Sequence, residues 1–387
     1  MTEFTSVSPA EFDLPTNLVA RLLSPALVVD LGRVRRNLGT MLGHLDGEAA
    51  RWRPHIKTAK IPEVFAEYAH AGLRHFKCAT VREARELLAV LGQSGVEAPD
   101  LLVAYPLLGP ALEQLGRLAA SHPGARVSVL CEVPGAVAEV PAQLDIYVDV
   151  NPGMHRTGIP AAELQSVLAV ARAAGSRFGG VHYYDGHLHG SDADQRRRSA
   201  FACYDAAVTL VAALEGAGVA VPELITSGTP TFREALAYAP FRELGGTVHR
   251  ISPGTVVYHD QRCEQEDPHT GLVPAAVVLT RVVSHPGPGR ATCDAGSKSL
   301  AAEAGDPCAI VLGHPGWVTE TPSEEHLPLR ITDGPPPERG AVLLLVPRHV
   351  CPTVNLAETA VLLEPGRAPR AVAVAARAHD LGLLPGD

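Results

Sequence analysis

Short apolar segments recur eight times between residues 52 and 252, and segments typical of amphipathic helices separate them. The apolar segments are rich in β-branched residues, whereas Ala, Leu, Glu and Arg dominate the segments between them. This alternation predicts parallel β-α-β units, and eight of them favour a closed (β/α)8 barrel of the TIM type over an open sheet. The predicted strands cover residues 52–57, 76–80, 101–105, 127–130, 146–151, 180–185, 223–227 and 249–252.

The pattern changes after residue 260, where apolar runs are separated by turns such as HPGPGR and no long helical period remains. This favours a C-terminal β domain. We predict a barrel domain over residues 1–260 and a β-rich domain over 261–387, with residues 1–24 open to pairing with the β domain. The strands expected in the second domain cover 275–283, 291–294, 309–312, 317–319, 341–346 and 360–363.

Charge and composition exclude several classes of protein. The net charge is −9 and no stretch concentrates the 33 Lys and Arg residues, which argues against a nucleic-acid partner. No uncharged apolar run approaches the roughly 18 residues that cross a bilayer, and the opening MTEFTSVSPAEFDLP does not resemble a secretory signal. Seven cysteines without a CxxC pair fit reduced thiols. We expect a cytoplasmic protein with no membrane partner.

Reactive residues of a barrel lie at the C-terminal ends of its strands. Lys57 ends the first predicted strand, and partial burial there makes a lysine amine a better nucleophile toward a carbonyl. The alternative is an ordinary surface lysine, and Lys60 is a competitor that we expect to be solvated. Thr80, after the second strand, is expected to cap a helix over 82–92, with Glu83 completing a capping box.

The last two predicted strands end in SGTPT, residues 227–231, and SPGT, residues 252–255. Small residues let backbone N–H groups approach an anion, and barrels often bind phosphate at the loops after their seventh and eighth strands. The alternative is ordinary turn chemistry.

The fifth strand is followed by Arg156, whose planar guanidinium suits an anionic oxygen. The sixth ends in HYYDGHLH, residues 182–189. On a strand, His182 and Tyr184 face one side and Tyr183 and Asp185 the other.

In the second domain, His349 and Cys351 follow the apolar run AVLLLV. In an extended segment their side chains point to the same side, so an imidazole nitrogen and a thiolate can bind one cation. This soft pair favours Zn²⁺. The alternative is a chance HxC pattern.

Taken together, the motifs resemble those of the metal-activated pyridoxal-phosphate enzymes of fold type III, the group of the D-threonine aldolases and D-serine dehydratases. The resemblance covers roughly residues 20–375 and rests on RPHIKTAK, FKCATVREAR, DLLVAYPLLGP, VDVNPGMHRTGI, SGTPT, SPGT and PRHVCPTVNL, in this order. It implies an alanine-racemase-like barrel followed by a β domain, a homodimer, and two cofactors: pyridoxal 5'-phosphate and a divalent metal, Zn or Mn.

The resemblance also implies residue roles. Lys57 matches the lysine that carries pyridoxal phosphate, and His349 and Cys351 match the metal ligands. The cysteine resembles the zinc site of the D-serine dehydratases, whereas aldolases carry an aspartate there. His187 and His189 lie in a segment that contacts substrate, which makes them candidate catalytic bases. The expected cofactor-binding residues are Lys57, Arg156, His182, Tyr184, Ser227, Gly228, Thr229, Gly254 and Thr255.

The implied activity is a lyase reaction on a small D-configured β-hydroxy-α-amino acid. In our leading interpretation, His187 or His189 takes the hydroxyl proton and retro-aldol cleavage gives glycine and an aldehyde. In the alternative, Lys57 removes the α-proton and a dehydratase reaction gives a 2-oxo acid and ammonia. A racemase needs a tyrosine base from the β domain, and no tyrosine follows Tyr258. A non-catalytic pyridoxal-phosphate carrier needs neither the metal pair nor a second domain.

Overall fold

The structure is a computed structural model, and it describes residues 8–382. These residues form two compact units. The barrel unit contains residues 41–57, 65–254 and 378–382, and the β unit contains residues 8–40, 58–64 and 255–377. Helices α2 (Leu31–His44) and α3 (Pro62–His70) belong partly to each unit. The domain boundary between residues 260 and 261 stays a prediction.

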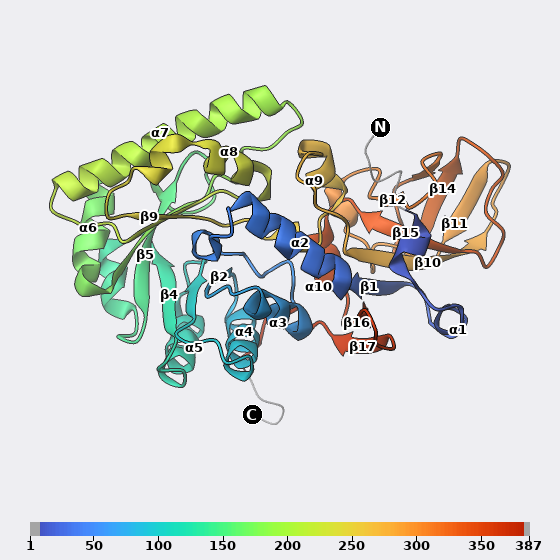
Figure 1. The fold of residues 1–387 in the computed structure, drawn as a ribbon, viewed down its shortest axis with the longest axis horizontal. Coiled ribbons are helices and arrows are strands. Elements are labelled where there is room, and N and C mark those ends of the chain that lie inside the picture. Colours follow the sequence, from blue (N-terminus) through green and yellow to red (C-terminus); the bar gives the residue numbers. More distant parts are fainter. Residues whose placement is uncertain (1–7, 383–387) are drawn as a thin grey trace. The chain divides into compact units, whose positions relative to one another are not determined.

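The barrel unit is built on a parallel sheet with strand order β2-β3-β4-β5-β7-β8-β9, and the short β6 pairs with β5. Single bridges from Trp52 to Ile251 of β9 and from His55 to Lys77 of β2 join the two ends of this sheet. The predicted TIM-like barrel is therefore confirmed (Figure 1). Its strands are β2 (His75–Cys78), β3 (Asp100–Val103), β4 (Arg126–Cys131), β5 (Asp145–Asn151), β6 (Ile159–Pro160), β7 (Phe178–Tyr183), β8 (Glu223–Thr226) and β9 (Val248–Ile251).

The first predicted strand differs from the expectation. Residues 52–57 make two single bridges instead of a full strand, because Pro54 has no N–H to donate. Lys57 consequently lies in the turn that follows. Strands β2, β3, β7, β8 and β9 also end one or two residues earlier than predicted, so that Asp185, Ser227 and Ser252 lie on the loops that leave the barrel.

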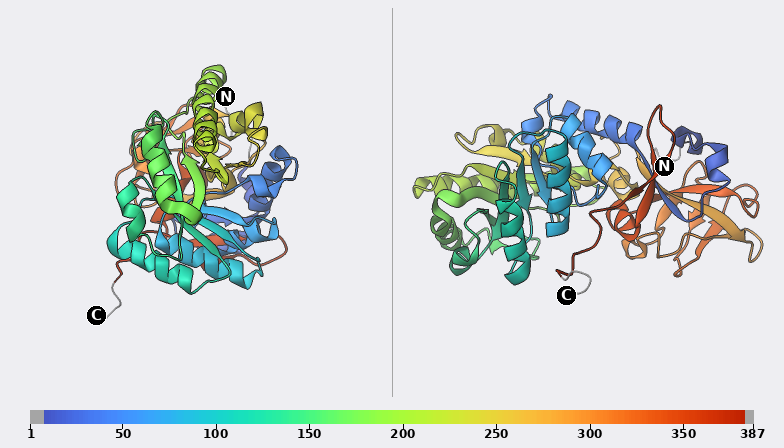
Figure 2. Two further views of the ribbon diagram at one scale, coloured as in Figure 1. Left: turned by 90° about the vertical axis from the view of Figure 1, so that its left-hand side faces the viewer. Right: turned by 90° about the horizontal axis from the view of Figure 1, so that it is seen from below.

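Helices lie around the outside of the barrel strands (Figure 1 and Figure 2). The predicted cap of α4 is confirmed, since the Thr80 hydroxyl accepts a hydrogen bond from the Glu83 N–H. The Glu83 carboxylate accepts from the Ala79 N–H at 2.7 Å. The helices of this unit are α4 (Val81–Gln93), α5 (Gly109–Ala120), α6 (Leu164–Ala174), α7 (Ala193–Gly216) and α8 (Phe232–Ala237).

Helix α7 has 24 residues, and by length and composition alone it could cross a membrane. One helix of this kind is weak evidence for a membrane span, because core helices of globular proteins pass the same test. In the barrel unit it carries buried polar contacts. The Arg196 Nε donates to Glu234 at 2.9 Å, and the Tyr204 hydroxyl donates to Asp185 at 2.8 Å. These contacts identify α7 as a helix of the barrel wall.

A buried ionic network crosses the inside of the barrel. The guanidinium of Arg53 is fully buried and donates to both carboxylate oxygens of Glu223 at 2.8 Å and to Asp100 at 2.9 Å. The Tyr147 hydroxyl also donates to Glu223, at 2.9 Å. Burial raises the pKa of both carboxyls, but the charge of Arg53 outweighs burial and the pKa of Asp100 and Glu223 is lowered. One side chain thus links the short first segment to β3 and β8.

The β unit contains an antiparallel barrel with an extension. Its strand order is β11-β14-β13-β12-β15-β10-β1-β16-β17, and β11 also pairs with β10, which closes six strands on themselves. Strand β1 pairs antiparallel with β10 and parallel with β16. Its strands are β1 (Ala26–Asp30), β10 (Ala276–Ser284), β11 (Arg290–Cys293), β12 (Ala309–Val311), β13 (Trp317–Thr319), β14 (Leu327–Ile331), β15 (Val342–Pro347), β16 (Thr359–Leu363) and β17 (Arg370–Ala373).

The predicted C-terminal β domain is confirmed. Three strands of the β unit were not predicted, β1, β14 and β17. Both β14 and β17 are short and contain proline or arginine beside their apolar residues. The short helix α9 (Gln261–Glu266) precedes β10, α10 (Val350–Leu356) lies between β15 and β16, and α1 (Thr16–Val19) precedes β1. In the described part of segment 1–24, Phe12 and Leu18 pack on an apolar face with Val28 and Val277. Residues 1–7 of that segment lie outside the described residues.

Replacing Arg53 tests whether the network holds the barrel closed. Arg53→Ala removes the buried guanidinium that Glu223 and Asp100 share and leaves them only Arg250 and Arg126, respectively, as cationic partners. We therefore expect a loss of about 3–5 kcal/mol in the free energy of unfolding. The exposed pair of Arg242 and Asp46, 3.4 Å apart, supplies the control, and Arg242→Ala should cost less than about 1 kcal/mol. Urea unfolding followed by circular dichroism measures both. Equal losses in the two variants would contradict the role given to Arg53.

Candidate active site

The predicted site residues are divided between the two units. Those of the barrel unit lie on β7 or on the segments that follow the C-terminal ends of barrel strands, as the barrel architecture predicts. They are Lys57, Arg156, His182, Tyr184, His187, His189, Ser227, Gly228, Thr229 and Gly254, and the β unit contributes Thr255, His349 and Cys351.

Lys57 lies in the turn after the bridged first segment and is half-buried. The preceding Ile56 N–H donates to the carbonyl of Lys77 at 2.8 Å, which ties this turn to β2. An amine is therefore held at the mouth of the barrel, where a carbonyl compound can reach it. The competitor Lys60 is buried in the β unit and not solvated as we expected, and its Nζ lies 3.5 Å from the Ala376 carbonyl.

Lys77 is a second lysine of the barrel mouth, and no sequence pattern predicted it as a site residue. It is 2% exposed on β2, and its Nζ lies 3.5 Å from the Nε2 of His182 and 5.1 Å from the centre of the Tyr184 ring. Burial, followed by the charges of Lys57 and Arg156, holds the pKa of Lys77 well below its usual range. The only signal in the sequence was a lysine between apolar residues of a strand, in FKC.

The imidazole of His182 is buried and its Nδ1 lies 2.7 Å from the Oδ1 of Asp149. Burial lowers the pKa of His182 by more than Asp149 raises it. For Asp149, burial is outweighed by the hydrogen bond and charge of His182, and its pKa is lowered. An ionised Asp149 therefore fixes the proton of a neutral His182 on Nδ1 and leaves its Nε2 as an acceptor that faces Lys77.

The predicted alternation along HYYD is confirmed by contacts. The rings of His182 and Tyr184 stack with centres 6.3 Å apart. The Tyr183 hydroxyl donates to the Cys203 carbonyl, and Asp185 accepts from Tyr204, both on α7. One side of the segment thus faces the barrel mouth and the other faces the helix wall.

Tyr184 is flanked by two basic side chains. The Arg156 guanidinium and the Lys77 Nζ each lie 5.1 Å from the centre of its ring. A cation at this distance from an aromatic face is attracted by the ring quadrupole. Arg156 and Tyr184 were both predicted to bind the cofactor, and the structure brings the two side chains together.

The loop after β8 has the features of an anion site. The Ser227 hydroxyl is buried and has no hydrogen-bond partner among the described residues, and the backbone of Ser227 has a φ of 60°. A Cβ on Gly254, in the loop after β9, would lie 2.3 Å from the His55 carbonyl oxygen, so only glycine fits there. An unpartnered hydroxyl and a backbone without side chains fit the phosphate of pyridoxal phosphate.

Asp185 lies behind this loop and is fully buried. Its Oδ2 accepts hydrogen bonds from Tyr204 at 2.8 Å and from Thr231 at 2.9 Å. Burial raises the pKa of Asp185 to about 6, against these hydrogen bonds. The carboxyl group therefore anchors the loop while it is partly protonated near neutral pH.

Three histidines gather at the ends of β5 and β7. Burial, with the charges of His155 and His189, lowers the pKa of His187. The His187 Nδ1 is buried and has no partner among the described residues, whereas His155 shares a 3.3 Å contact with Asn151. A neutral imidazole such as His187 is able to accept a proton at neutral pH. His155 was not predicted as part of this cluster.

His349 and Cys351 come together, but not by the geometry we expected. His349 is the N-cap of α10 and Cys351 lies in its first turn, so the two do not share an extended segment. Burial disfavours the charged imidazole, but a hydrogen bond with Cys351 and the charges of Cys351 and Asp260 raise the pKa of His349. An imidazole and a thiol in hydrogen-bond contact fit two ligands of a soft divalent cation. No larger cluster of metal ligands occurs within residues 8–382.

Two threonines contact the thiol of Cys351 within the β unit. The Thr58 Oγ1 lies 3.1 Å from the Sγ, and the Thr255 Oγ1 lies 3.4 Å from it. Asp260 accepts from the Val350 N–H at 2.9 Å and so fixes the start of α10. Tyr258, the last tyrosine of the chain, is buried in this unit and its hydroxyl donates to the Ala59 carbonyl.

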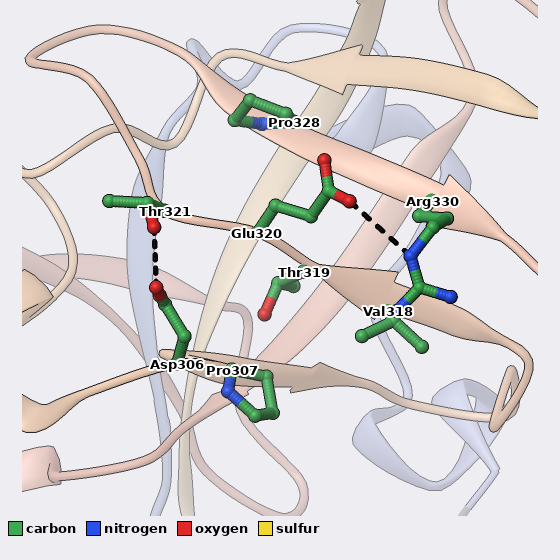
Figure 3. A pocket seen from close by; sticks show the side chains of 8 residues that line it. All are labelled: Asp306, Pro307, Val318, Thr319, Glu320, Thr321, Pro328 and Arg330. Atoms are coloured by element: carbon green, nitrogen blue, oxygen red, sulfur yellow. Dashed lines mark hydrogen bonds and ion pairs between the residues drawn. The ribbon is translucent and has the colours of Figure 1, made fainter.

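A separate pocket of about 570 Å³ opens on the β unit (Figure 3). Glu320 pairs there with Arg330 at 3.3 Å, and Thr321 donates to Asp306. It contains none of the predicted site residues, which distinguishes it from the candidate site.

The fold is a barrel of the alanine racemase type followed by a β domain, and comparison with known proteins agrees. Residues 29–261 match the family model "Alanine racemase, N-terminal domain", and residues 275–363 match the "Putative serine dehydratase domain".

The chain is 31% identical to a D-threonine aldolase of an Arthrobacter species, over 91% of this chain and 92% of the relative. It is 26% identical to a D-threo-3-hydroxyaspartate dehydratase of a Delftia species, over 85% of this chain and 91% of the relative. The crystal structure of D-threonine aldolase from Filomicrobium marinum matches with a TM-score of 0.79 and 26% identity, over 92% of this chain and 96% of that one. The chain therefore belongs to the fold type III, pyridoxal-phosphate-dependent family of D-threonine aldolase-like lyases.

Asp185 gives a pH-dependent prediction for stability. Its pKa is about 6 in the folded protein and 3.8 in the reference state. Asp185 therefore keeps its proton up to a higher pH in the folded protein than in the unfolded chain. Stability falls as the pH rises from about 4 to 7, by about 3 kcal/mol for this group. Urea unfolding of the wild type and Asp185→Asn at both pH values measures the difference. If the two proteins respond alike to pH, Asp185 is not the buried acid described above.

Proposed function

We propose that this chain is a pyridoxal-phosphate- and divalent-metal-dependent lyase that cleaves the Cα–Cβ bond of a D-configured β-hydroxy-α-amino acid to glycine and an aldehyde. One observation carries the proposal. Lys57 is bonded in the chain to Thr58, whose hydroxyl lies 3.1 Å from the Sγ of Cys351. The lysine that suits a carbonyl cofactor is therefore the chain neighbour of a threonine that contacts the thiol suited to a cation.

The proposal gives each group of residues a role. Lys57 holds the cofactor, and Arg156 binds its phenolic oxygen. Ser227, with its unpartnered hydroxyl, binds the phosphate together with Gly228, Thr229, Gly254 and Thr255. His182 and Tyr184 contact the cofactor ring, and His349 and Cys351 bind the cation.

Pyridoxal phosphate supplies an electron sink for the electrons of the broken bond, and the cation supplies Lewis acidity toward the substrate hydroxyl. The protein has to take the hydroxyl proton and orient the substrate. His187 suits the first task, because its imidazole is held neutral and has a free buried nitrogen. His189 is the second candidate for the same base.

The dehydratase reaction is the second candidate function, and Cys351 favours it through its resemblance to the zinc site of the D-serine dehydratases. In that reaction Lys57 removes the α-proton, the hydroxyl leaves, and a 2-oxo acid and ammonia are the products. We rank the aldolase first, because candidate bases lie beside the barrel mouth and the more similar of the two relatives compared above is a D-threonine aldolase.

We further propose that the cation is Zn²⁺ or Mn²⁺, that the protein is a homodimer and that it works in the cytoplasm. The thiol ligand supports Zn²⁺. Exposed apolar side chains after β3 and β4, among them Leu108 at 69% and Val133 at 52% exposure, support self-association. All seven cysteines are free, which supports a reducing compartment.

The products formed from D-threonine distinguish the aldolase from the dehydratase reaction. With D-threonine and pyridoxal phosphate, we expect glycine and acetaldehyde in equal amounts, and no reaction with L-threonine. Chromatography of the products measures both. Formation of 2-oxobutanoate and ammonia would replace the aldolase by the dehydratase, whereas no turnover of any D-β-hydroxy-amino acid would favour a non-catalytic carrier.

Removal of the metal tests the role of the β unit. Treatment with EDTA should abolish activity, and Zn²⁺ or Mn²⁺ should restore it. Cys351→Ser should weaken metal binding by at least about tenfold in equilibrium dialysis, because a hydroxyl is a poor soft ligand. Cys263→Ser changes another thiol of the β unit and serves as the control. Activity that survives EDTA, with exchange of D- and L-alanine, would point to a racemase instead.

A further inference from the structure

Lysine is rare in this chain, and its four lysines are Lys57, Lys60, Lys77 and Lys298. Lys77 is the most buried of them, with 2% of its surface exposed inside the barrel unit. Among the described residues, no carboxylate oxygen lies within ion-pair distance of its Nζ, and its one polar neighbour at 3.5 Å is the His182 Nε2. Buried charged groups in proteins are normally paired, so an unpaired buried lysine indicates a missing partner.

The neighbouring charges make the partner an anion. Lys57 and Arg156 both act on Lys77 as positive charges. The two nearby carboxylates are engaged elsewhere, since Asp149 contacts His182 at 2.7 Å and Asp185 accepts from Tyr204 and Thr231. Neither carboxylate therefore forms an ion pair with Lys77, which faces the place where the ligand of Lys57 is expected.

We propose that Lys77 binds an anionic oxygen of the ligand held at Lys57, which is either the phenolic oxygen of the cofactor or the α-carboxylate of the amino-acid substrate. The inference rests on the proposed function, because it takes Lys57 as the residue that carries the cofactor. It adds a second amine to the site.

The surroundings of Lys77 position its amine for this task. Asp149 orients His182, and the Nε2 of His182 accepts from the Nζ of Lys77 at 3.5 Å. The centre of the Tyr184 ring lies 5.1 Å from the same Nζ. These contacts use one donor of the amine and leave its other donors for a ligand.

Binding of the anionic ligand should also protonate Lys77. Burial, Lys57, Arg156 and Arg53 disfavour its charged form, and Asp185 favours it, so the pKa of Lys77 is low in the free protein. An anion beside the amine raises the pKa of Lys77, and the complex takes up a proton. Affinity for the anion should consequently fall as the pH rises.

The test compares Lys77→Met with the wild type, and Lys60→Met serves as the matched control, because Lys60 is a buried lysine of the β unit that contacts a backbone carbonyl. The thermal midpoint of each ligand-free protein is measured first. Lys77→Met should melt at or above the wild-type temperature, because it removes a buried amine that lacks an ion-pair partner. A clear loss of thermal stability confined to Lys77→Met would assign Lys77 a structural role and overturn the proposal.

Two titrations then distinguish the sources of the anion. If the partner is the phenolic oxygen, the Kd for pyridoxal phosphate, followed by absorbance without substrate, rises by about tenfold or more in Lys77→Met. If the partner is the substrate carboxylate, that Kd stays unchanged and the KM for D-threonine rises by a similar factor. The amino alcohol D-threoninol, which has no carboxylate, should then bind equally well to both proteins.

Unchanged affinity for cofactor and for D-threonine in Lys77→Met overturns the inference while the proposed function stands. A wild-type protein that gives no absorbance band with pyridoxal phosphate overturns the proposed function itself. Either affinity change, absent from Lys60→Met, supports the role of Lys77.

Discussion

The barrel depends on one buried guanidinium. The first segment of the barrel makes only two single bridges, to Ile251 and to Lys77, because Pro54 interrupts it. Arg53 supplies the links that this segment lacks, through Glu223 on β8 and Asp100 on β3. Lys57 follows four residues later, so the same contacts fix the place of the amine at the barrel mouth.

The interior of this barrel is polar at two levels. Barrel interiors of this type are usually filled by bulky branched apolar side chains. Here an ionic layer around Arg53 lies within the strands, and a second layer contains Lys77, His182 and Asp149. In the first layer every charged group is paired, since Arg53 and Arg250 contact Glu223 and Arg53 and Arg126 contact Asp100. The second has an amine without an ion-pair partner, and this difference distinguishes a structural network from a ligand site.

Much of the architecture followed from sequence periodicity. Apolar runs with β-branched residues located seven barrel strands and most of the β domain, because these strands are buried on both faces or on one. The first barrel strand was predicted too long, because Pro54 interrupts it. Strands β1, β14 and β17 were not predicted, and proline or arginine breaks the patterns of the last two. The pairing of β1 with β10 joins residues some 250 positions apart, and no local pattern contains that information.

The residues of the candidate site were likewise predicted only in part from the sequence. Residues at strand ends, such as Arg156, His182 and Tyr184, were predicted from alternation and position. Lys77 was not, because a lysine in a strand is usually read as a residue of the solvent face, and only the closed barrel turns it inward. The pairing of His349 with Cys351 was predicted for an extended segment and is instead made at the start of α10.

The central claim is that Lys57 carries the cofactor at the mouth of this barrel. The most direct measurement is reduction of the protein with borohydride after incubation with pyridoxal phosphate, followed by mass spectrometry of the peptides. Because the chain has only four lysines, each position is assigned without ambiguity. The account predicts the phosphopyridoxyl group on the peptide that contains Lys57, with one group per chain. Its presence on Lys60, Lys77 or Lys298 in place of Lys57 would contradict the account.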